Sequence, residues 1–208
     1  MSSYRANSIH HPNQPAGGRD LSTYEGQLQV DRSALLGKKI LDLGSGPHVK
    51  LAQQLHDLDS RTTVVSLSPD FSDTEHRTVA QEKGLSLGVA ALGQALPFKN
   101  NSFDGVLALH VQEHLSRDGV PAVVAEIARV LKPGGVGKLG PVPDVPYDWG
   151  SFEDASAYPA IDALNAQGVH VSKQPIPTDV IPFITFKDAH DFRHYDVPSF
   201  VFSIEKQP

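Results

Sequence analysis

Residues Ile40–Lys50, with the sequence ILDLGSGPHVK, predict a buried strand that runs into a glycine loop and then into a helix. The strand part is apolar except for Asp42. Gly44 and Gly46 permit a tight turn and a close approach of a ligand to the backbone. In open sheets of parallel strands, ligands bind beyond the carboxyl ends of the strands. This loop is therefore the first candidate for a binding site.

Downstream of the loop, strand-like and helix-like segments alternate along the chain. The clearest helix is predicted over 120–131, where apolar residues form one continuous face between Pro121 and the stop signal KPGG. This alternation indicates parallel strands with helices on both faces, which is a Rossmann-like, doubly wound α/β fold. We expect a single domain over 36–208, preceded by an N-terminal arm or irregular lead-in over 1–35. Further strands are predicted at 62–68, 85–92, 103–111, 135–142, 181–186 and 199–206, and further helices at 48–58, with Val49, Ala52, Leu55 and Leu58 buried, and near 158–168.

Composition excludes several classes of protein. The chain has 208 residues, 39% hydrophobic and 20% charged, which is typical of a globular protein. It has no cysteine, so disulfides, thiolate catalysis and cysteine-based zinc sites are excluded. The net charge is −6 and the basic residues are scattered, so we expect no nucleic-acid partner. No window approaches the about 18 apolar residues of a membrane helix, and residues 1–30 lack the apolar core of a signal peptide, so we expect a cytoplasmic protein.

The glycine loop is poorly suited to a phosphate ligand. In the dinucleotide motif GxGxxG the third glycine would stand at Val49, and Pro47 removes a backbone N–H near the expected phosphate position. The chain also lacks the triphosphate-binding motif GxxxxGK followed by Ser or Thr. S-adenosylmethionine fits better, because its ammonium and sulfonium groups need acceptors and an acid such as Asp42. Alternatively, Asp42 braces the loop by accepting backbone N–H bonds.

Four ordered segments resemble the class I S-adenosylmethionine-dependent methyltransferases, in the small-molecule (type 11-like) branch. They are ILDLGSGP, VVSLSPDF, ALPFKNNSFDGVLALHVQEHL and EIARVLKPGG, and together they cover roughly 38–142 in the order typical of the family. The resemblance implies a mostly parallel seven-stranded sheet with an antiparallel last strand. It also implies S-adenosylmethionine bound at the first loop and methyl transfer to a small-molecule acceptor.

Two acids that are common in the family are absent here. The acid that binds both ribose hydroxyls corresponds to Ser66, and Asp70 offers a carboxylate nearby. The acid near the adenine amine corresponds to Leu92, with Gln94 two residues on. An inactive methyltransferase-like binding or scaffolding module is therefore the alternative function. The cofactor-binding residues that the resemblance and the loop predict are Asp42, Gly44, Ser45, Gly46, Ser66, Leu67, Asp70, Leu92, Gln94 and His110.

His110 ends the strand 103–111 and is the predicted catalytic base, because a neutral imidazole takes up a proton near neutral pH. Alternatively, it lines the cofactor or forms a hydrogen bond in the core. Two loops are expected to shape the acceptor site. One follows the strand 135–142, and the other follows 181–186 if that strand runs parallel to the rest. The predicted acceptor-site residues on them are Tyr147, Trp149, His190, Arg193, His194 and Tyr195; no metal site is predicted.

Overall fold

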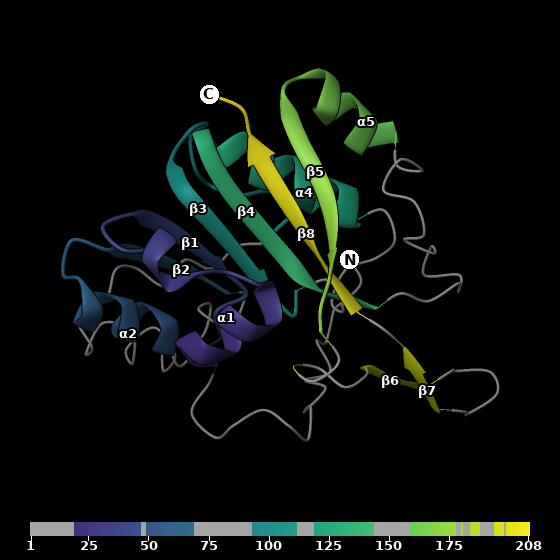
Figure 1. Ribbon diagram of the computed structural model, residues 1–208. Helices are drawn as coiled ribbons and strands as arrows, with labels where there is room; N and C mark the ends of the chain where they lie inside the picture. The colour runs from purple at the N-terminus through teal and green to yellow at the C-terminus, as the bar shows by residue number, and fades with distance from the viewer. Residues whose placement is uncertain are drawn as a thin grey trace, which may run out of the picture.

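The computed structural model describes residues 19–46, 49–68, 93–111, 119–143, 159–177, 180, 184–187, 194–197 and 199–208. Helices and strands alternate through these ranges, as the sequence predicted (Figure 1). In chain order they are α1 (Leu21–Leu28), the 3-10 turn η1 (Arg32–Ala34), β1 (Lys39–Leu43), α2 (Lys50–Leu58), β2 (Thr63–Leu67), β3 (Phe103–Leu109), α4 (Gly119–Val130), β4 (Leu131–Pro143), α5 (Pro159–Ala166), β5 (Val169–Pro175), β6 (Ile184–Lys187), β7 (His194–Val197) and β8 (Ser199–Lys206).

The main sheet has the strand order β2-β1-β3-β4-β8-β5. The first four strands are parallel, whereas β8 runs antiparallel to both of its neighbours, β4 and β5. The predicted α/β fold with a mostly parallel sheet and an antiparallel last strand is therefore confirmed. Six strands are described instead of seven, and the strand expected at 85–92 lies outside the described residues.

One strand prediction is wrong. The segment 181–186 was expected to join the main sheet, but its described part, β6, pairs with β7 in a separate two-stranded sheet. The place in the main sheet belongs to β5, whose sequence VHVSKQP is mostly polar. In β5, only Val169 and Val171 are buried, and both belong to the core cluster that α4 covers. The hydrophobic pattern of β5 is therefore weaker than that of IPFITF.

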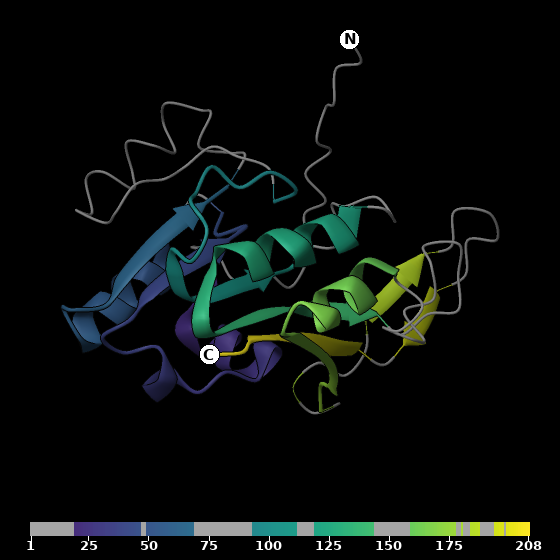
Figure 2. The ribbon, with the colours of Figure 1, turned by 90° about the horizontal axis from the view of Figure 1, so that it is seen from above.

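Helices cover both faces of the sheet, with α4 and α5 on one side and α1 on the other (Figure 2). The side chains of α2 share the hydrophobic core of α1 and therefore lie on its face. In α2, Leu51, Ala52 and Leu55 are buried, whereas Leu58, which was expected in the buried stripe, is 52% exposed at the helix end. None of the helices in the described ranges is long and apolar enough to cross a membrane.

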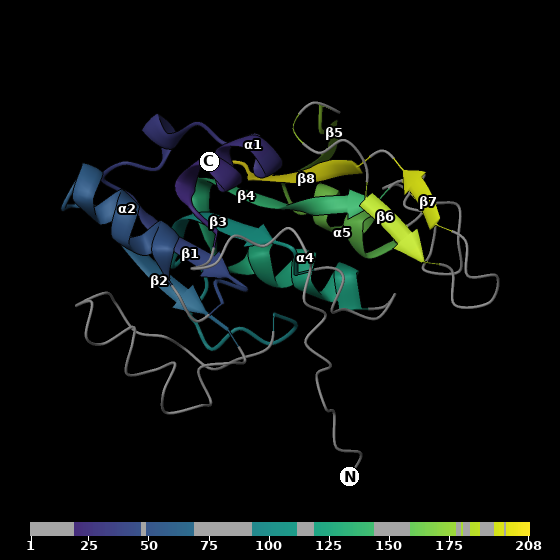
Figure 3. The ribbon, with the colours of Figure 1, turned by 90° about the horizontal axis from the view of Figure 1, so that it is seen from below.

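Residues 19–35 belong to the expected N-terminal arm, but they carry a helix that packs on the sheet. The side chain of Asp20 accepts a hydrogen bond from the backbone N–H of Thr23 at 3.0 Å and thereby caps α1. Leu21, Tyr24 and Leu28 then enter the same core cluster as residues of β1, α2 and β3. Helix α1 is therefore fixed on this face of the sheet (Figure 3), and η1 leads into the amino end of β1.

The segment 93–100 is bound to α4 by one ion pair. Arg129 donates to the carbonyls of Leu96 and Phe98 at 3.0 and 2.7 Å, and Glu126 accepts from the backbone N–H of Leu96 at 2.7 Å. The two side chains also bind each other, with Nε of Arg129 2.6 Å from the carboxylate. This contact joins the sequence segments ALPF and EIAR.

We expect Arg129→Met to lower the free energy of unfolding by about 1 to 2 kcal/mol, because the half-buried carbonyls of Leu96 and Phe98 lose their donor. Urea unfolding monitored by circular dichroism measures the change. Arg61→Met is the matched control, because the side chain of Arg61 is 82% exposed in its ion pair with Asp59 and should contribute much less. Equal effects of the two substitutions would contradict the bridging role of Arg129.

Candidate functional site

The loop after β1 is held by the end of β2. The backbone N–H groups of Gly44 and Ser45 donate to the carbonyl of Leu67 at 2.7 and 3.2 Å. Gly44 and Gly46 have φ of +77° and +64°, which side chains disfavour. A Cβ on Gly44 would lie 2.7 Å from Cγ2 of Val111, whereas a Cβ on Gly46 would meet nothing within 4 Å among the described residues. Gly44 is therefore required by packing, and the backbone at Gly46 is left accessible.

Two non-glycine residues also adopt left-handed backbone at the rim of the sheet, which is the edge formed by the carboxyl ends of its parallel strands. Val49, at the start of α2, has φ of +45°, and His110, directly after β3, has φ of +58°. Left-handed backbone is uncommon for non-glycine residues and an outlier for a β-branched one. Strained backbone of this kind clusters at functional sites in proteins. The strain at this rim therefore agrees with the position predicted for the binding site.

Asp42 lies under helix α1 and is 1% exposed. The hydroxyl of Tyr24 donates to its Oδ1 at 2.8 Å. Burial raises the pKa of Asp42 to about 7, against the opposing effects of the Tyr24 hydrogen bond and the nearby charge of Arg19. Burial and the neighbouring carboxyl of Asp42 raise the pKa of Tyr24 in turn. In the described part of the chain, Asp42 thus joins α1 to the sheet, and its hydrogen-bond donor is the side chain of Tyr24 rather than the backbone of the loop.

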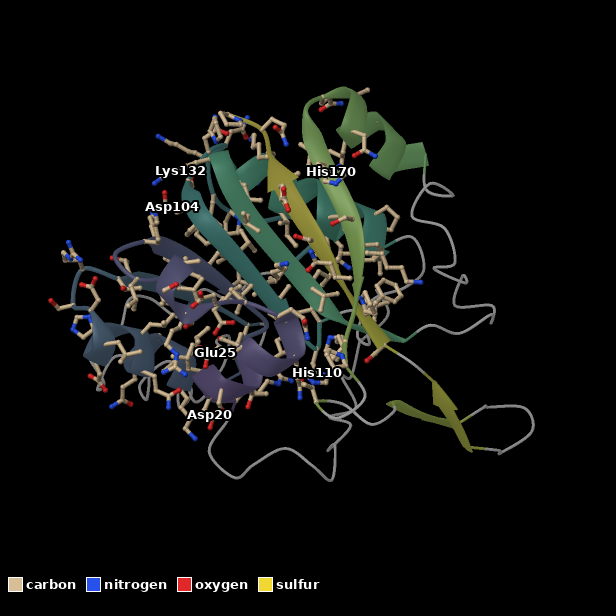
Figure 4. The ribbon with its side chains drawn as sticks, in the orientation of Figure 1. Asp20, Glu25, Asp104, His110, Lys132 and His170 are labelled. Atoms are coloured by element: carbon tan, nitrogen blue, oxygen red, sulfur yellow. The ribbon has the colours of Figure 1, made fainter. Side chains whose placement is uncertain are left out.

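Two further side chains from the N-terminal segment reach the rim. Nη1 of Arg19 donates to the carbonyls of Gly44 and Leu109, both at 3.2 Å. Oε1 of Gln27 forms a hydrogen bond with Nε2 of His110 at 2.8 Å. Figure 4 shows His110 at this end of the sheet, beside α1 and opposite to the end that carries Asp104. The N-terminal segment therefore contacts both the glycine loop and the end of β3.

The described cofactor-site residues have different surroundings. Ser66 is the register neighbour of Asp42, and its buried Oγ has no hydrogen-bond partner among the described residues. Leu67 packs into the core that α4 covers, so its carbonyl rather than its side chain serves the loop. Ser45 is buried and donates to the carbonyl of Gly46 at 3.1 Å. Gln94 is exposed in a turn.

The other predicted residues are not placed at the site. Because β6 does not join the main sheet, the argument that put the loop after it on the cofactor rim no longer holds. His194 and Tyr195 lie on β7, and only their backbone is described. Asp70, Leu92, Tyr147, Trp149, His190 and Arg193 lie outside the described residues.

Sequence reasoning missed Arg19, Tyr24 and Gln27, because 1–35 was treated as an arm. A signal was present: Asp20 is a typical N-cap, and Leu21, Tyr24 and Leu28 follow it at helical spacing.

Residues 41–137 match the family model of the methyltransferase domain, a range that covers the glycine loop, β3 and α4. The chain is thus similar to this family over 97 of its 208 residues, slightly under half of its length. An uncharacterized methyltransferase of Mycobacterium avium is 35% identical to it over 103 residues, which are 50% of this chain and 39% of the relative. The chain thus spans well under half of the length of that relative.

Solved structures share the fold of this chain. The cyclase SpnF superposes with a TM-score of 0.57 at 17% identity, covering 89% of this chain and 80% of its own. The 1,6-didemethyltoxoflavin-N1-methyltransferase of Burkholderia thailandensis superposes with a TM-score of 0.53 at 17% identity, covering 85% and 76%. That structure contains its acceptor and S-adenosylhomocysteine. At this identity the likeness concerns the fold alone.

Proposed function

We propose that the chain binds S-adenosylmethionine at the carboxyl ends of β1, β2 and β3 and transfers its methyl group to a small-molecule acceptor. The observation that carries the proposal is the set of groups at this rim. Gly46 presents open backbone, the buried hydroxyl of Ser66 lacks a partner among the described residues, and the carboxyl of Asp42 lies beside it in register. Buried polar groups in folded proteins nearly always have a partner, and Ser66 combines an unsatisfied hydroxyl with a position at the end of β2, next to the glycine loop, where a ligand can reach it.

The residues at the rim fit the different parts of this cofactor. The loop Gly44–Gly46 would hold the amino-acid part, Ser66 and Asp70 the ribose, and Leu92 and Gln94 the adenine. When bound, the cofactor supplies a methyl group on a sulfonium. The protein then has to position the acceptor and accept any proton that it releases.

His110 is the proposed proton acceptor at this rim. Its Nε2 lies 2.8 Å from the amide oxygen of Gln27, which only accepts, so Nε2 carries the ring hydrogen in this arrangement. Proton uptake at Nε2 requires Gln27 to yield its place to the acceptor and the ring hydrogen to stand on Nδ1 instead. In this role Gln27 orients the ring in the resting protein. The acceptor-site residues Tyr147, Trp149, His190, Arg193, His194 and Tyr195 remain predictions from sequence.

Two observations favour the alternative of a methyltransferase-like binding module. Ser66 offers one neutral hydrogen bond where the family acid offers two stronger, charge-assisted ones. In addition, His110 is already bound by Gln27. The two functions differ first in whether S-adenosylhomocysteine binds.

We expect calorimetric titration with S-adenosylhomocysteine to give a dissociation constant on the order of micromolar. Ser66→Ala should weaken binding about fivefold, the effect of one neutral hydrogen bond. Ser203→Ala is the matched control, since Ser203 is equally buried on β8 and its Oγ also lacks a partner in the described ranges. If the folded protein fails to bind at millimolar concentration, the enzyme proposal is overturned and the binding-module alternative is favoured.

A further inference from the structure

Arg19 is fixed between two neighbouring strands of the sheet. Its Nη1 donates to the carbonyl of Gly44, which follows β1, and to the carbonyl of Leu109, which ends β3. These strands are adjacent and parallel, with Leu43 opposite Ala108, so both carbonyls stand at the same rim. The two hydrogens of Nη1 match the two acceptors. The guanidinium is therefore held in one place, at the loop that is proposed to receive the cofactor.

The rest of the guanidinium retains donor capacity. An arginine has five N–H groups, of which the two carbonyls take two, and the charge of Arg19 also acts on the hydroxyl of Tyr24, whose pKa it lowers against the raising effects of burial and Asp42. No carboxylate forms an ion pair with Arg19 in the described part of the chain. The carboxyl of Asp42 is occupied by Tyr24, and the carboxylate of the neighbouring Asp20 caps α1. Among the described residues, Arg19 is thus a half-buried cation with donors left for an anion.

We propose that Arg19 binds the carboxylate of the amino-acid part of S-adenosylmethionine, an inference that rests on the proposed function. The planar fork of a guanidinium matches a carboxylate in a bidentate, charge-assisted pair. The adenosine part of the cofactor carries no anion, so the carboxylate is the group of this ligand that suits the site. Arg19 thereby makes the N-terminal segment part of the cofactor site and selects ligands that carry an intact amino acid.

The experiment compares two ligands in three variants by calorimetric titration. The ligands are S-adenosylhomocysteine and its decarboxylated analogue, which keeps the adenosine, the thioether and the ammonium and lacks only the carboxylate. The variants are Arg19→Met, Arg19→Lys and the matched control Arg32→Met. Arg32 belongs to the same N-terminal segment, but its exposed side chain pairs with Glu25. Because the readout is the ratio of two affinities in one protein, partial loss of folded protein does not change it.

In the wild type we expect S-adenosylhomocysteine to bind about tenfold to a hundredfold more tightly than the analogue. Arg19→Met should reduce this ratio to within about threefold by weakening S-adenosylhomocysteine alone. Arg19→Lys should give an intermediate ratio, and Arg32→Met should leave it unchanged.

Two results would overturn the inference while leaving the proposed function intact. One is an unchanged ratio in Arg19→Met. The other is tighter binding of both ligands by Arg19→Met, which would mean that the guanidinium competes with the ligand's ammonium for the two carbonyls. If the folded wild type binds neither ligand, the proposed function fails and the inference fails with it.

Discussion

Asp42→Asn is expected to make the protein more stable than the wild type at pH 8 and about equally stable at pH 4. In the folded protein the pKa of Asp42 is raised to about 7, whereas in the unfolded chain it returns to the ordinary value of 3.8. Between these values the folded state holds a proton that the unfolded state has released. Stability from this group is therefore complete below pH 4 and is lost as the pH rises towards 7. The difference of about three between the two pKa values of Asp42 corresponds to a loss of about 4 kcal/mol in the free energy of unfolding.

Urea unfolding of both proteins from pH 4 to pH 8 measures this difference, since titrations common to both cancel. Asparagine keeps the oxygen that accepts from Tyr24 and cannot ionise, so it isolates the charge.

Asp104→Asn is a control of opposite sign. Burial raises the pKa of Asp104, but Lys132 at 2.8 Å and the backbone N–H of Lys39 at 2.9 Å outweigh this and lower it. This substitution should therefore cost stability at pH 7, and the cost should fade as the pH falls below the ordinary carboxyl range.

Parallel stability curves for Asp42→Asn and the wild type would show that Asp42 ionises normally.

The central strands and α4 were predictable because their patterns are strong and local. β3 is buried and without polar side chains from Gly105 to Leu109, as a strand covered on both faces must be, and α4 repeats its buried residues at helical spacing. β5 was missed for the opposite reason. It lies at the sheet edge, where polar residues are tolerated, so its pattern does not separate it from a loop.

The candidate site was predictable where residues adjacent in the sequence form it. It was less predictable where segments that are distant in the sequence come together. Gly44 and Gly46 predict the turn of the glycine loop directly. The hydrogen-bond partners of Asp42 and His110, which are Tyr24 and Gln27, come from α1. The residues that surround Asp42 and His110 in the sequence do not predict these partners. These contacts arise from tertiary packing, which a pattern read along one chain does not encode.

The interactions of α1 link the stability of the N-terminal segment to the state of the site. Tyr24 joins Asp42, Gln27 joins His110, and Arg19 joins the two strand ends. A ligand that displaces any one of these contacts also removes an interaction that holds the N-terminal segment against the sheet. Cofactor binding is therefore expected to alter hydrogen exchange in 19–28 as well as in the glycine loop.

Gly44→Ala is expected to lower the free energy of unfolding by about 2 to 5 kcal/mol. Two costs add here. A left-handed backbone at φ of +77° costs an alanine about 1 to 2 kcal/mol, and the clash of its Cβ with Val111 at 2.7 Å costs about 1 to 3 kcal/mol. Gly46→Ala separates the two, because it has the same kind of backbone, with φ of +64°, and no neighbour within 4 Å among the described residues. It should cost only the backbone part.

A double substitution tests the clash directly. Val111→Ala in the Gly44→Ala background should restore most of the difference between the two glycine variants, because it removes the methyl group that the new Cβ meets. The open space at Gly46 is the part of the loop proposed to face the cofactor. Gly46→Ala should therefore weaken S-adenosylhomocysteine more than its small stability cost would suggest. If the two glycine variants lose equal stability, Gly44 is required only for its backbone conformation, and the contact with Val111 contributes nothing to holding the loop against β3.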